Sequence, residues 1–257
     1  MKESLLVSVI TVVYNGEKYL QQTIDSVAGQ TYDNIEYIII DGGSTDGTLG
    51  IIRNNLGHIS KWISEPDEGI YDAMNKGIKL ANGDLIGIIN SDDWFAPNAI
   101  KEVVDAYKKN KDKKVFHGDR YDIKSNKKKR LYRFNPSKFK FLYFSMTYNH
   151  PSMFFHREIY ESVKYNTKLR VFSDYELVLK LFLKDPSIFC YIPIAYVNYR
   201  LEGISTQQTF FNYTREGARA RLNAGLSPFH VAIHIALRSI YHVLKIVTKT
   251  DMKLRKK

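Results

Sequence analysis

Leu-Val-Ser-Val-Ile-Thr-Val-Val-Tyr-Asn-Gly, at positions 6–16, is the stretch that decides the fold class of this chain. Its residues up to Val13 form a β-branched run typical of a strand that is buried on both faces. The run stops at Asn15-Gly16, and Leu20, Ile24 and Val27 then recur at helical spacing. A buried strand followed at once by an amphipathic helix is the start of a βαβ unit, which requires a parallel sheet.

The same alternation continues to about residue 110. Further strands are predicted at 35–40, around 62–64 and at 85–89, and helical patterns cover 70–78 and 100–107. We therefore predict an α/β fold in which a mostly parallel sheet is flanked by helices and binds a ligand at its strand ends.

Beyond residue 110 the sequence becomes more basic and more aromatic. A hairpin is predicted over 124–133 and a strand at 152–155, and helices at 175–183 and 207–224 flank a strand-like run over 188–199. We predict one catalytic domain over residues 1–225, with a mixed second half, 111–225, that closes over the first half, 1–110. Residues 226–257 form a separate C-terminal helix and basic tail.

The composition is that of an ordinary globular domain. The 257 residues carry 38 Lys and Arg against 27 Asp and Glu, and the net charge of +11 favours an anionic partner. The single cysteine, Cys190, lies in an apolar run, so we expect no disulfide and a reducing cytoplasm. We expect neither a secretory signal nor a membrane span, because no stretch reaches about 18 consecutive apolar residues.

Polar side chains follow three of the predicted strands, where an open parallel sheet binds its ligand. Asn15 follows the first strand, Asp41 the second, and Asn90-Ser91-Asp92-Asp93 the fourth. Adjacent carboxylates repel one another unless a cation neutralises them, and oxygen ligands without His or Cys suit Mg²⁺ or Mn²⁺. The sequence thus predicts a metal-held diphosphate, and the alternative for Asp92-Asp93 is a turn that caps the next helix. No Gly-x-Gly-x-x-Gly follows the first strand and no P-loop sequence occurs, which argues against those nucleotide folds.

Four segments, taken in order, resemble the family-2 inverting glycosyltransferases of GT-A fold over roughly residues 5–200. They are Val9–Gly16, Asp41–Thr48, Ala73–Gly77 and Asn90–Asp93. The longer segment Asp67–Gly77 (DEGIYDAMNKG) is similar to a subgroup from bacterial polysaccharide gene clusters. The resemblance implies a GT-A fold and transfer of a sugar with inversion from a nucleotide-sugar donor, most often a UDP-sugar, to a saccharide acceptor.

The resemblance also assigns donor-binding roles. Asp41 would hydrogen-bond the base, and the backbone of 13–15 would line the nucleotide pocket. Asp92 matches the last Asp of the family's Asp-x-Asp motif and would bind Mn²⁺ or Mg²⁺, while Asn90 replaces the first Asp and would contact the ribose. Met74 stands where many members carry an Arg near the diphosphate, so Lys76 is the candidate phosphate cation. The donor-binding candidates are Val13, Tyr14, Asn15, Asp41, Asn75, Lys76, Asn90 and Ser91.

An inverting transfer needs one general base for the acceptor hydroxyl. In the resembled family an acid at the start of a helix in the second half supplies it, and Asp174 in Ser173-Asp174-Tyr175-Glu176 takes that position. The alternative for Asp174 is a helix N-cap, and Glu176 ranks below it because it points to another side of the helix. Lower-ranked candidates, each with a structural alternative, are Asp67, Asp72, Asp93, His150, Glu176 and Arg200.

The C-terminal segment has an amphipathic helical pattern. Polar residues recur there at steps of three or four: His230, His234, Arg238, His242, Lys245 and Lys249. The other face is apolar and the tail is basic, so residues 229–257 are predicted to lie in the interface of an anionic bilayer, on the inner face of the cell membrane. A lipid-linked acceptor would lie at the same surface. The alternative is that the helix packs on the catalytic domain or on a second subunit.

Two other functions stay open. A nucleotidyltransferase acting on sugar phosphates would also hold a nucleotide and Mg²⁺, but Asn15-Gly16-Glu17-Lys18 is a poor match for its Gly-rich basic loop. A basic nucleic-acid-binding protein is the alternative from a different class. No nucleic acid is expected, because the lysine runs at 108–114 and 124–130 lack interleaved aromatic residues.

Overall fold

The computed structural model describes residues 5–124, 128–201 and 209–254, with side chains up to Lys245. Its strands are β1 (Val7–Val13), β2 (Ile35–Asp41), β3 (Lys61–Ser64), β4 (Leu85–Asn90), β5 (Trp94–Phe95), β6 (Val115–Ile123), β7 (Lys129–Tyr132), β8 (Phe154–His156) and β9 (Phe189–Arg200). Its helices are α1 (Leu20–Ala28), α2 (Thr48–Asn54), α3 (Ile70–Leu80), α4 (Ala99–Lys109), α5 (Lys138–Tyr143), α6 (Glu158–Ser162), α7 (Ser173–Lys184), α8 (Phe210–Asn223) and α9 (Pro228–Leu254).

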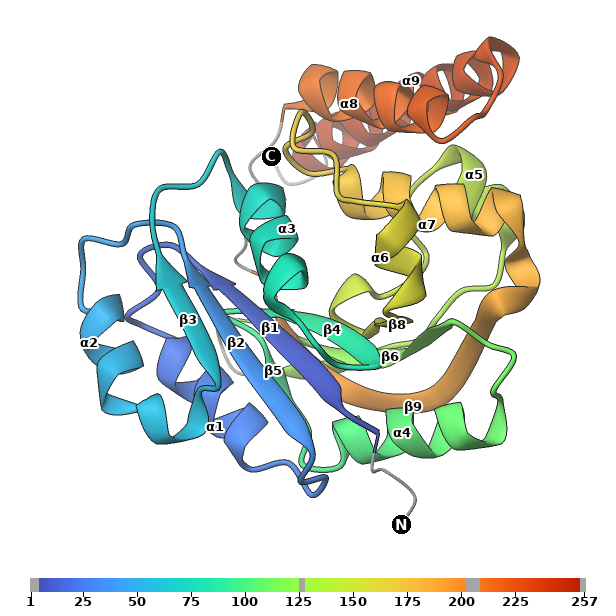
Figure 1. Ribbon diagram of the computed structural model, residues 1–257. Helices are drawn as coiled ribbons and strands as arrows, with labels where there is room; N and C mark the ends of the chain where they lie inside the picture. The colour runs from blue at the N-terminus through green and yellow to red at the C-terminus, as the bar shows by residue number, and fades with distance from the viewer. Residues whose placement is uncertain (1–4, 125–127, 202–208, 255–257) are drawn as a thin grey trace.

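One mixed sheet runs through the molecule in the order β3-β2-β1-β4-β8-β6-β9-β5, with β7 paired to β6 (Figure 1). β1 is parallel to both β2 and β4, and β2 is parallel to β3. β8 is antiparallel to β4 and β6, and β6 is parallel to β9. The α/β fold with a parallel first half and a mixed second half is confirmed.

Both faces of the parallel strands are covered, because β1 carries apolar residues on each side. Ile10 belongs to the core cluster that also holds Met74 of α3, whereas Val9 belongs to the cluster with Leu20 of α1. A Cβ on Gly77 would lie only 2.4 Å from Cγ2 of Ile10, so glycine at this position lets α3 pack closely against the sheet. This contact fixes α3 above the strand ends, where the polar residues lie.

The second half differs from the predicted elements in several places. α6 was not predicted, and the first strand of the hairpin, β6, ends at Ile123, before the predicted range of 124–133. α5 was not predicted from the sequence, and the strand predicted from Ser152 is wrong at its start, because His150–Ser152 form a 3₁₀ turn. The Ser152 hydroxyl lies 2.8 Å from the carbonyl oxygens of both Asn149 and Gly118 and can donate to either, which stabilises the turn in place of a strand ladder.

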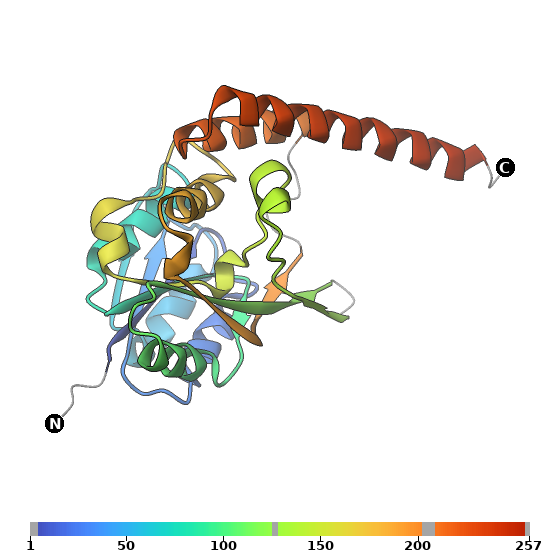
Figure 2. The same cartoon turned by 90° about the vertical axis from the view of Figure 1, so that its right-hand side faces the viewer.

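The C-terminal helix α9 packs against α8 and α5 and then extends past the rest of the molecule (Figure 2). The first part of its polar stripe contacts the protein: His234 is fully buried, and its Nδ1 lies 2.7 Å from the Tyr143 carbonyl oxygen. Ile240, Val243 and other apolar residues of α9 are more than half exposed. Within the described residues, no helix is long and apolar enough to cross a membrane.

Candidate active site

Asp41 ends β2 and organises the loop that follows it. Its carboxylate is fully buried and accepts hydrogen bonds from the backbone N–H groups of Gly43 (3.1 Å) and Ser44 (3.0 Å). The hydroxyls of Ser44 and Ser64 donate to it as well, at 2.5 and 2.7 Å. Three of these donors contact Oδ2 and one contacts Oδ1, so most of the acceptor capacity of the carboxylate is used within the protein. Asp41 therefore positions the loop in this arrangement.

Asn15 joins the loop after β1 to the Asp41 loop. It adopts a φ of 49°, in the left-handed region that Asn tolerates better than most residues. Its backbone N–H donates to the Ser44 hydroxyl (2.7 Å), and its side-chain oxygen accepts from the Thr45 N–H (2.9 Å). Val13 is buried beneath this loop, whereas the Tyr14 side chain is 66% exposed at its surface. The two loops thus form one rigid edge at the strand ends.

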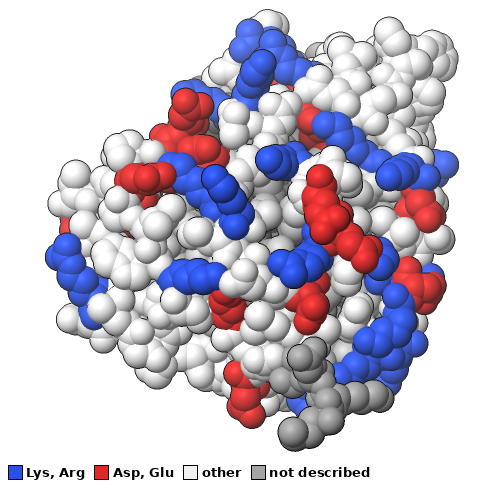
Figure 3. Space-filling view, viewed as in Figure 1, with Lys and Arg blue, Asp and Glu red and all other residues white. Residues whose placement is uncertain are grey.

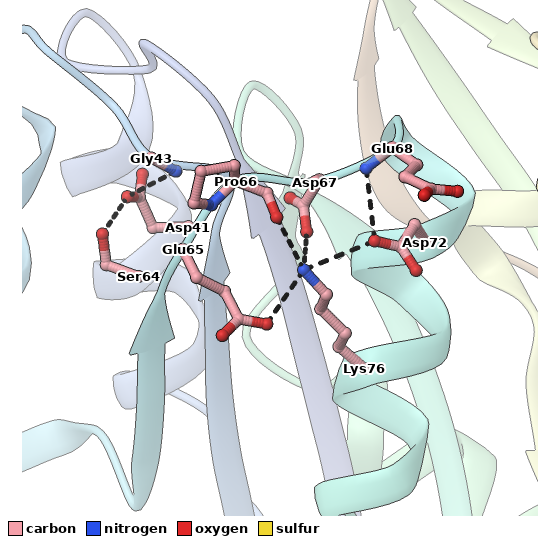
Figure 4. Close-up of polar contacts among 9 residues, drawn as sticks. All are labelled: Asp41, Gly43, Ser64, Glu65, Pro66, Asp67, Glu68, Asp72 and Lys76. Carbon is pink, nitrogen blue, oxygen red and sulfur yellow. Dashed lines mark hydrogen bonds and ion pairs between the residues drawn. The ribbon is translucent and has the colours of Figure 1, made fainter.

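Acidic side chains gather over the N-terminal end of α3, next to basic side chains over α8 at the top of the view (Figure 3). The Nζ of Lys76 in α3 lies among three carboxylates: Asp67 at 2.7 Å, Glu65 at 3.0 Å and Asp72 at 3.3 Å. It also donates to the Pro66 carbonyl at 2.9 Å (Figure 4). We call Glu65, Asp67, Asp72 and Lys76 the Lys76 cluster.

The Lys76 cluster ties α3 to the Asp41 loop. A Cβ on Gly42 would lie 2.7 Å from Oδ2 of Asp67, so the absence of a side chain there makes room for Asp67. Burial raises the pKa of Asp67, while the Lys76 ammonium opposes that effect. Burial would lower the pKa of Lys76, but its hydrogen bonds to Asp67 and Glu65 outweigh this and raise it. Lys76 is therefore a cation already held by carboxylates, and a diphosphate would have to compete with them.

Asn90, Ser91, Asp92 and Asp93 form the turn that follows β4. Thr23 of α1 holds this turn, because its hydroxyl lies 2.9 Å from the Ser91 carbonyl and 2.7 Å from that of Asp93. Asp92 is half-buried, whereas Asp93 is 1% exposed. Burial, and next the charge of Asp92, raise the pKa of Asp93 well above its usual range. Asp93 is thus an interior carboxyl group of the turn, and Asp92 is its outward neighbour.

Arg200, at the end of β9, closes the turn from the other side. Its backbone N–H donates to Oδ1 of Asp93 at 2.9 Å. Its guanidinium lies between two rings, 3.9 Å from the ring centroid of Tyr19 and 4.6 Å from that of Trp94, and donates to the Gln22 side chain. The structure therefore brings Asn90–Asp93 and Arg200 together, although about 110 residues separate them in the sequence.

The residues of this turn fit a hard divalent cation that arrives with phosphate oxygens. Mg²⁺ and Mn²⁺ prefer oxygen ligands, and Mg²⁺ is commonly held by one or two carboxylates while substrate phosphates and water complete the shell. Asp92 offers such a carboxylate, and Oδ2 of Asp93 beside it is a buried oxygen with no hydrogen-bond partner among the described residues. The same part of the chain gathers no group of three or more His, Cys, Asp or Glu that could hold a metal by itself.

Asp174 lies in the first turn of α7 and is half-buried. Its Oδ1 accepts a hydrogen bond from the hydroxyl of Tyr71 in α3, at 3.1 Å, and from the Tyr175 N–H at 2.8 Å. No donor within the described part of the chain contacts its Oδ2. The N-cap position of α7 belongs to Phe172, so the N-cap alternative for Asp174 is wrong. The geometry leaves one carboxylate oxygen available as a proton acceptor.

A cluster of aromatic rings and polar groups surrounds Asp174. The rings of Tyr71 and Tyr165 stack with centroids 5.7 Å apart, and Nε2 of His150 lies 2.7 Å from the Tyr165 hydroxyl. Burial lowers the pKa of His150, with the nearby Asp174 charge opposing, so the imidazole is neutral at pH 7. Asn75 exchanges two hydrogen bonds with the Tyr165 backbone, at 2.8 and 3.1 Å. These contacts dock the second half on α3.

Glu176 has a different environment from Asp174. It is 2% exposed and accepts hydrogen bonds from Asn166 (3.0 Å), Asn223 (2.9 Å) and the Lys180 ammonium (2.5 Å). This arrangement connects α7 to α8 and leaves Glu176 away from the strand-end loops.

The sequence pattern did not identify Tyr71 or Tyr165 as residues of the site. Its only signal for either was the position of Tyr71 inside the DEGIYDAMNKG segment.

Comparisons with known proteins agree with this fold and these motifs. The model of the family described as glycosyl transferase family 2 matches residues 8–164. An uncharacterized glycosyltransferase of Mycobacterium tuberculosis is 43% identical over 108 residues, which is 41% of this chain and 41% of that protein. The putative glycosyltransferase EpsH of Bacillus subtilis is 36% identical over 104 residues, 40% of this chain and 30% of that protein. The matched part spans less than half the length of either relative.

Solved structures extend the likeness to most of the chain. S. aureus TarS in complex with UDP-GlcNAc superposes with a TM-score of 0.69 at 19% identity, covering 90% of this chain and 70% of that one. The mannosyltransferase PcManGT from Pyrobaculum calidifontis, in complex with GDP-Man and Mn²⁺, superposes with a TM-score of 0.60 at 15% identity, covering 91% and 69%. At these identities the likeness concerns the fold, and it confirms the GT-A expectation. Because the family model matches more than half of this chain, the chain belongs to glycosyl transferase family 2.

Proposed function

We propose that this protein transfers a sugar, with inversion, from a UDP-sugar to a saccharide acceptor that is lipid-linked, in the synthesis of a cell-surface polysaccharide. The observation that carries the proposal is the position of Asp174 in the first turn of α7, where it is hydrogen-bonded to Tyr71 of α3. α3 is in turn tied to the Asp41 loop through Lys76 and Asp67. TarS bound UDP-GlcNAc and PcManGT bound GDP-Man with Mn²⁺, which supports a nucleotide-sugar donor in this fold. Family membership favours this function over the nucleotidyltransferase and the nucleic-acid binder.

The proposed reaction is a single displacement. The acceptor hydroxyl oxygen attacks the anomeric carbon from the side opposite the diphosphate, the bond from that carbon to the diphosphate oxygen breaks, and Oδ2 of Asp174 takes the hydroxyl proton. UDP leaves with the bonding electron pair. A Mg²⁺ or Mn²⁺ ion held by Asp92 would neutralise the charge of the diphosphate. Tyr71 keeps the Asp174 carboxylate in place through its hydrogen bond to Oδ1.

The donor-binding residues divide into two groups in this proposal. The backbone of Val13, Tyr14 and Asn15 would line the nucleotide, with Asn90 and Ser91 on its ribose and diphosphate side. Asp41, Asn75 and Lys76 hold the loops that form these surfaces, because each already has protein partners. We propose that these three act as positioning residues.

Asp174→Asn tests the proposed base. Asparagine keeps the size and an oxygen that can accept from Tyr71, but it cannot take a proton, so kcat should fall by roughly 10²–10⁴-fold while the KM for the donor changes little. Glu176→Gln is the matched control in the same helix. Because Glu176 holds α8 through Asn223 and the segment before α7 through Asn166, that change should lower the melting temperature but leave kcat of the folded enzyme within a few-fold. An Asp174→Asn enzyme with normal kcat would refute the assignment.

We further propose that the exposed apolar side of α9 contacts the cell membrane at its inner face. His230, His234 and Arg238 contact α5 and α8, and His234 is buried there. Ile240, Tyr241, Val243 and Leu244 of the same helix are more than half exposed. The sequence adds basic residues at 253–257. An exposed apolar helix face that adjoins basic residues is typical of a segment that lies in the interface of an anionic bilayer.

A further inference from the structure

A basic hollow lies between α8 and the segment that leads into α7. It has a volume of about 300 Å³ and is lined by Lys168, Arg170, Asn212, Arg215, Glu216 and Arg219. The last four residues stand at positions i, i+3, i+4 and i+7 of α8 and therefore share one face of that helix. None of the lining residues belongs to the strand-end loops described above, so the hollow is a separate feature.

The charges of the hollow are unbalanced. Lys168, Arg170, Arg215 and Arg219 are exposed, and none of the four forms an ion pair with another described residue. The one carboxylate, Glu216, is already engaged: its Oε1 accepts the backbone N–H groups of Arg170, Val171 and Phe172, at 2.5, 2.7 and 3.2 Å. Glu216 thereby holds the segment in place, and the four cationic side chains are left for an anionic ligand.

The same segment connects the hollow to the proposed base. Arg170 and Asp174 are four residues apart, so at most about 14 Å of extended chain separates them. Glu216 fixes the intervening backbone against α8, which makes this spacing a rigid property of the fold. An acceptor whose sugar hydroxyl reaches Asp174 could therefore carry an anionic group into the hollow, provided that a short saccharide joins the two.

We infer that this hollow binds a phosphate or diphosphate group of the acceptor substrate. Arginine guanidinium groups present paired N–H donors that match phosphate oxygens. The hollow has three such groups, Arg170 on the segment before α7 and Arg215 and Arg219 on α8. The inference rests on the proposed function, since it assigns the ligand to the acceptor. It also accounts for part of the excess positive charge of the chain at a defined site.

Isothermal titration of the full-length protein with inorganic pyrophosphate tests the site. The titration is done in EDTA, so that no metal ion can hold diphosphate at the strand ends. Arg215→Gln/Arg219→Gln should weaken pyrophosphate binding at least 10-fold, and Arg215→Lys/Arg219→Lys should weaken it less, because the charge remains and the paired donors are lost. Lys108→Gln/Lys109→Gln is the matched control, since it removes two exposed charges from α4 and should leave the affinity unchanged.

Further binding measurements show whether the phosphate is free or lipid-borne. They also show whether a negative result concerns this inference or the proposed function. Tighter binding of farnesyl diphosphate than of pyrophosphate would support a lipid-borne group, and equal binding would support a site for the phosphate alone. If the Arg215→Gln/Arg219→Gln variant loses binding to vesicles of phosphatidylglycerol and phosphatidylcholine but keeps its pyrophosphate affinity, the arginines serve the bilayer and the inference is overturned. If the protein binds UDP with Mg²⁺ but pyrophosphate affinity is equal in wild type and variant, the inference fails and the proposed function stands.

Discussion

Replacing Lys76 by methionine removes the cation that the carboxylates of the Lys76 cluster share. Methionine keeps the length of the side chain and its helix propensity, so α3 itself should persist. Asp67, Glu65 and Asp72 would then repel one another with no counter-charge, and Asp67 is the most deeply placed of them, with a side chain that is 10% exposed. The loop between β3 and α3 should loosen, and the Asp41 loop that Asp67 contacts through Gly42 should loosen with it.

The magnitude follows from the exposure of each pair. The contact with Glu65, whose side chain is 56% exposed, is worth well under about 1 kcal/mol because water screens it. The pair with Asp67 is a charged hydrogen bond at 2.7 Å between side chains that are 21% and 10% exposed, and such a bond contributes about 1.5–3 kcal/mol. We therefore expect Lys76→Met to lower the free energy of unfolding by about 2 kcal/mol. For a domain of this size that corresponds to a decrease of about 4–8 °C in melting temperature.

Thermal unfolding and UDP titration together distinguish the two roles of Lys76. Lys79→Met is the control, since Lys79 is exposed on the same helix and forms no ion pair among the described residues. If Lys76 is a positioning residue, Lys76→Met should lower the melting temperature of the ligand-free protein. It should also weaken the binding of UDP and of UMP to a similar degree. If Lys76→Met leaves the melting temperature unchanged and weakens UDP binding much more than UMP binding, Lys76 is the diphosphate cation and the reasoning from the Lys76 cluster is wrong.

Three other outcomes are expected. Asp92→Ala should abolish turnover, and EDTA should do so in the wild type until Mn²⁺ or Mg²⁺ is restored; full activity in EDTA would exclude the proposed metal. His234 has its pKa lowered to about 4 by burial, with the charges of Arg221 and Arg238 adding to the effect, so it contributes stability above about pH 6.5 that is lost as the pH falls toward 4. Urea unfolding should show the wild type losing up to about 3 kcal/mol over that range relative to His234→Gln, and parallel pH profiles would contradict the shift. Ile240→Gln/Val243→Gln should reduce sedimentation with anionic vesicles, whereas Leu131→Gln on β7 should not; equal binding by all three proteins would refute membrane contact by α9.

The architecture of the first half is determined by local sequence patterns. A strand that is buried on both faces must be apolar along its whole length, so the run at 7–13 and those that follow it are recognisable without any partner. The polar residues Asp41 and Asn90–Asp93 directly follow such runs, and parallel strands bring their carboxyl ends to one edge. The motifs of the family lie in these segments, and for that reason the fold and the general chemistry could be predicted.

Tertiary structure alone decided what each polar group contacts. Tyr71 and Asp174 are 103 residues apart and meet only because α3 packs against the start of α7. The helical repeat reveals the pair of Lys76 with Asp72, but not the contacts of Lys76 with Glu65 and Asp67 in the loop before α3. Nor does it reveal that His234 of α9 faces inward against Tyr143 of α5. Periodicity states that a helix has two unlike faces, but the free energy of packing depends on the complementary surface offered by distant segments. The sequence therefore determined the elements and the chemistry at their ends, and the packing of those elements decided which side chains act together.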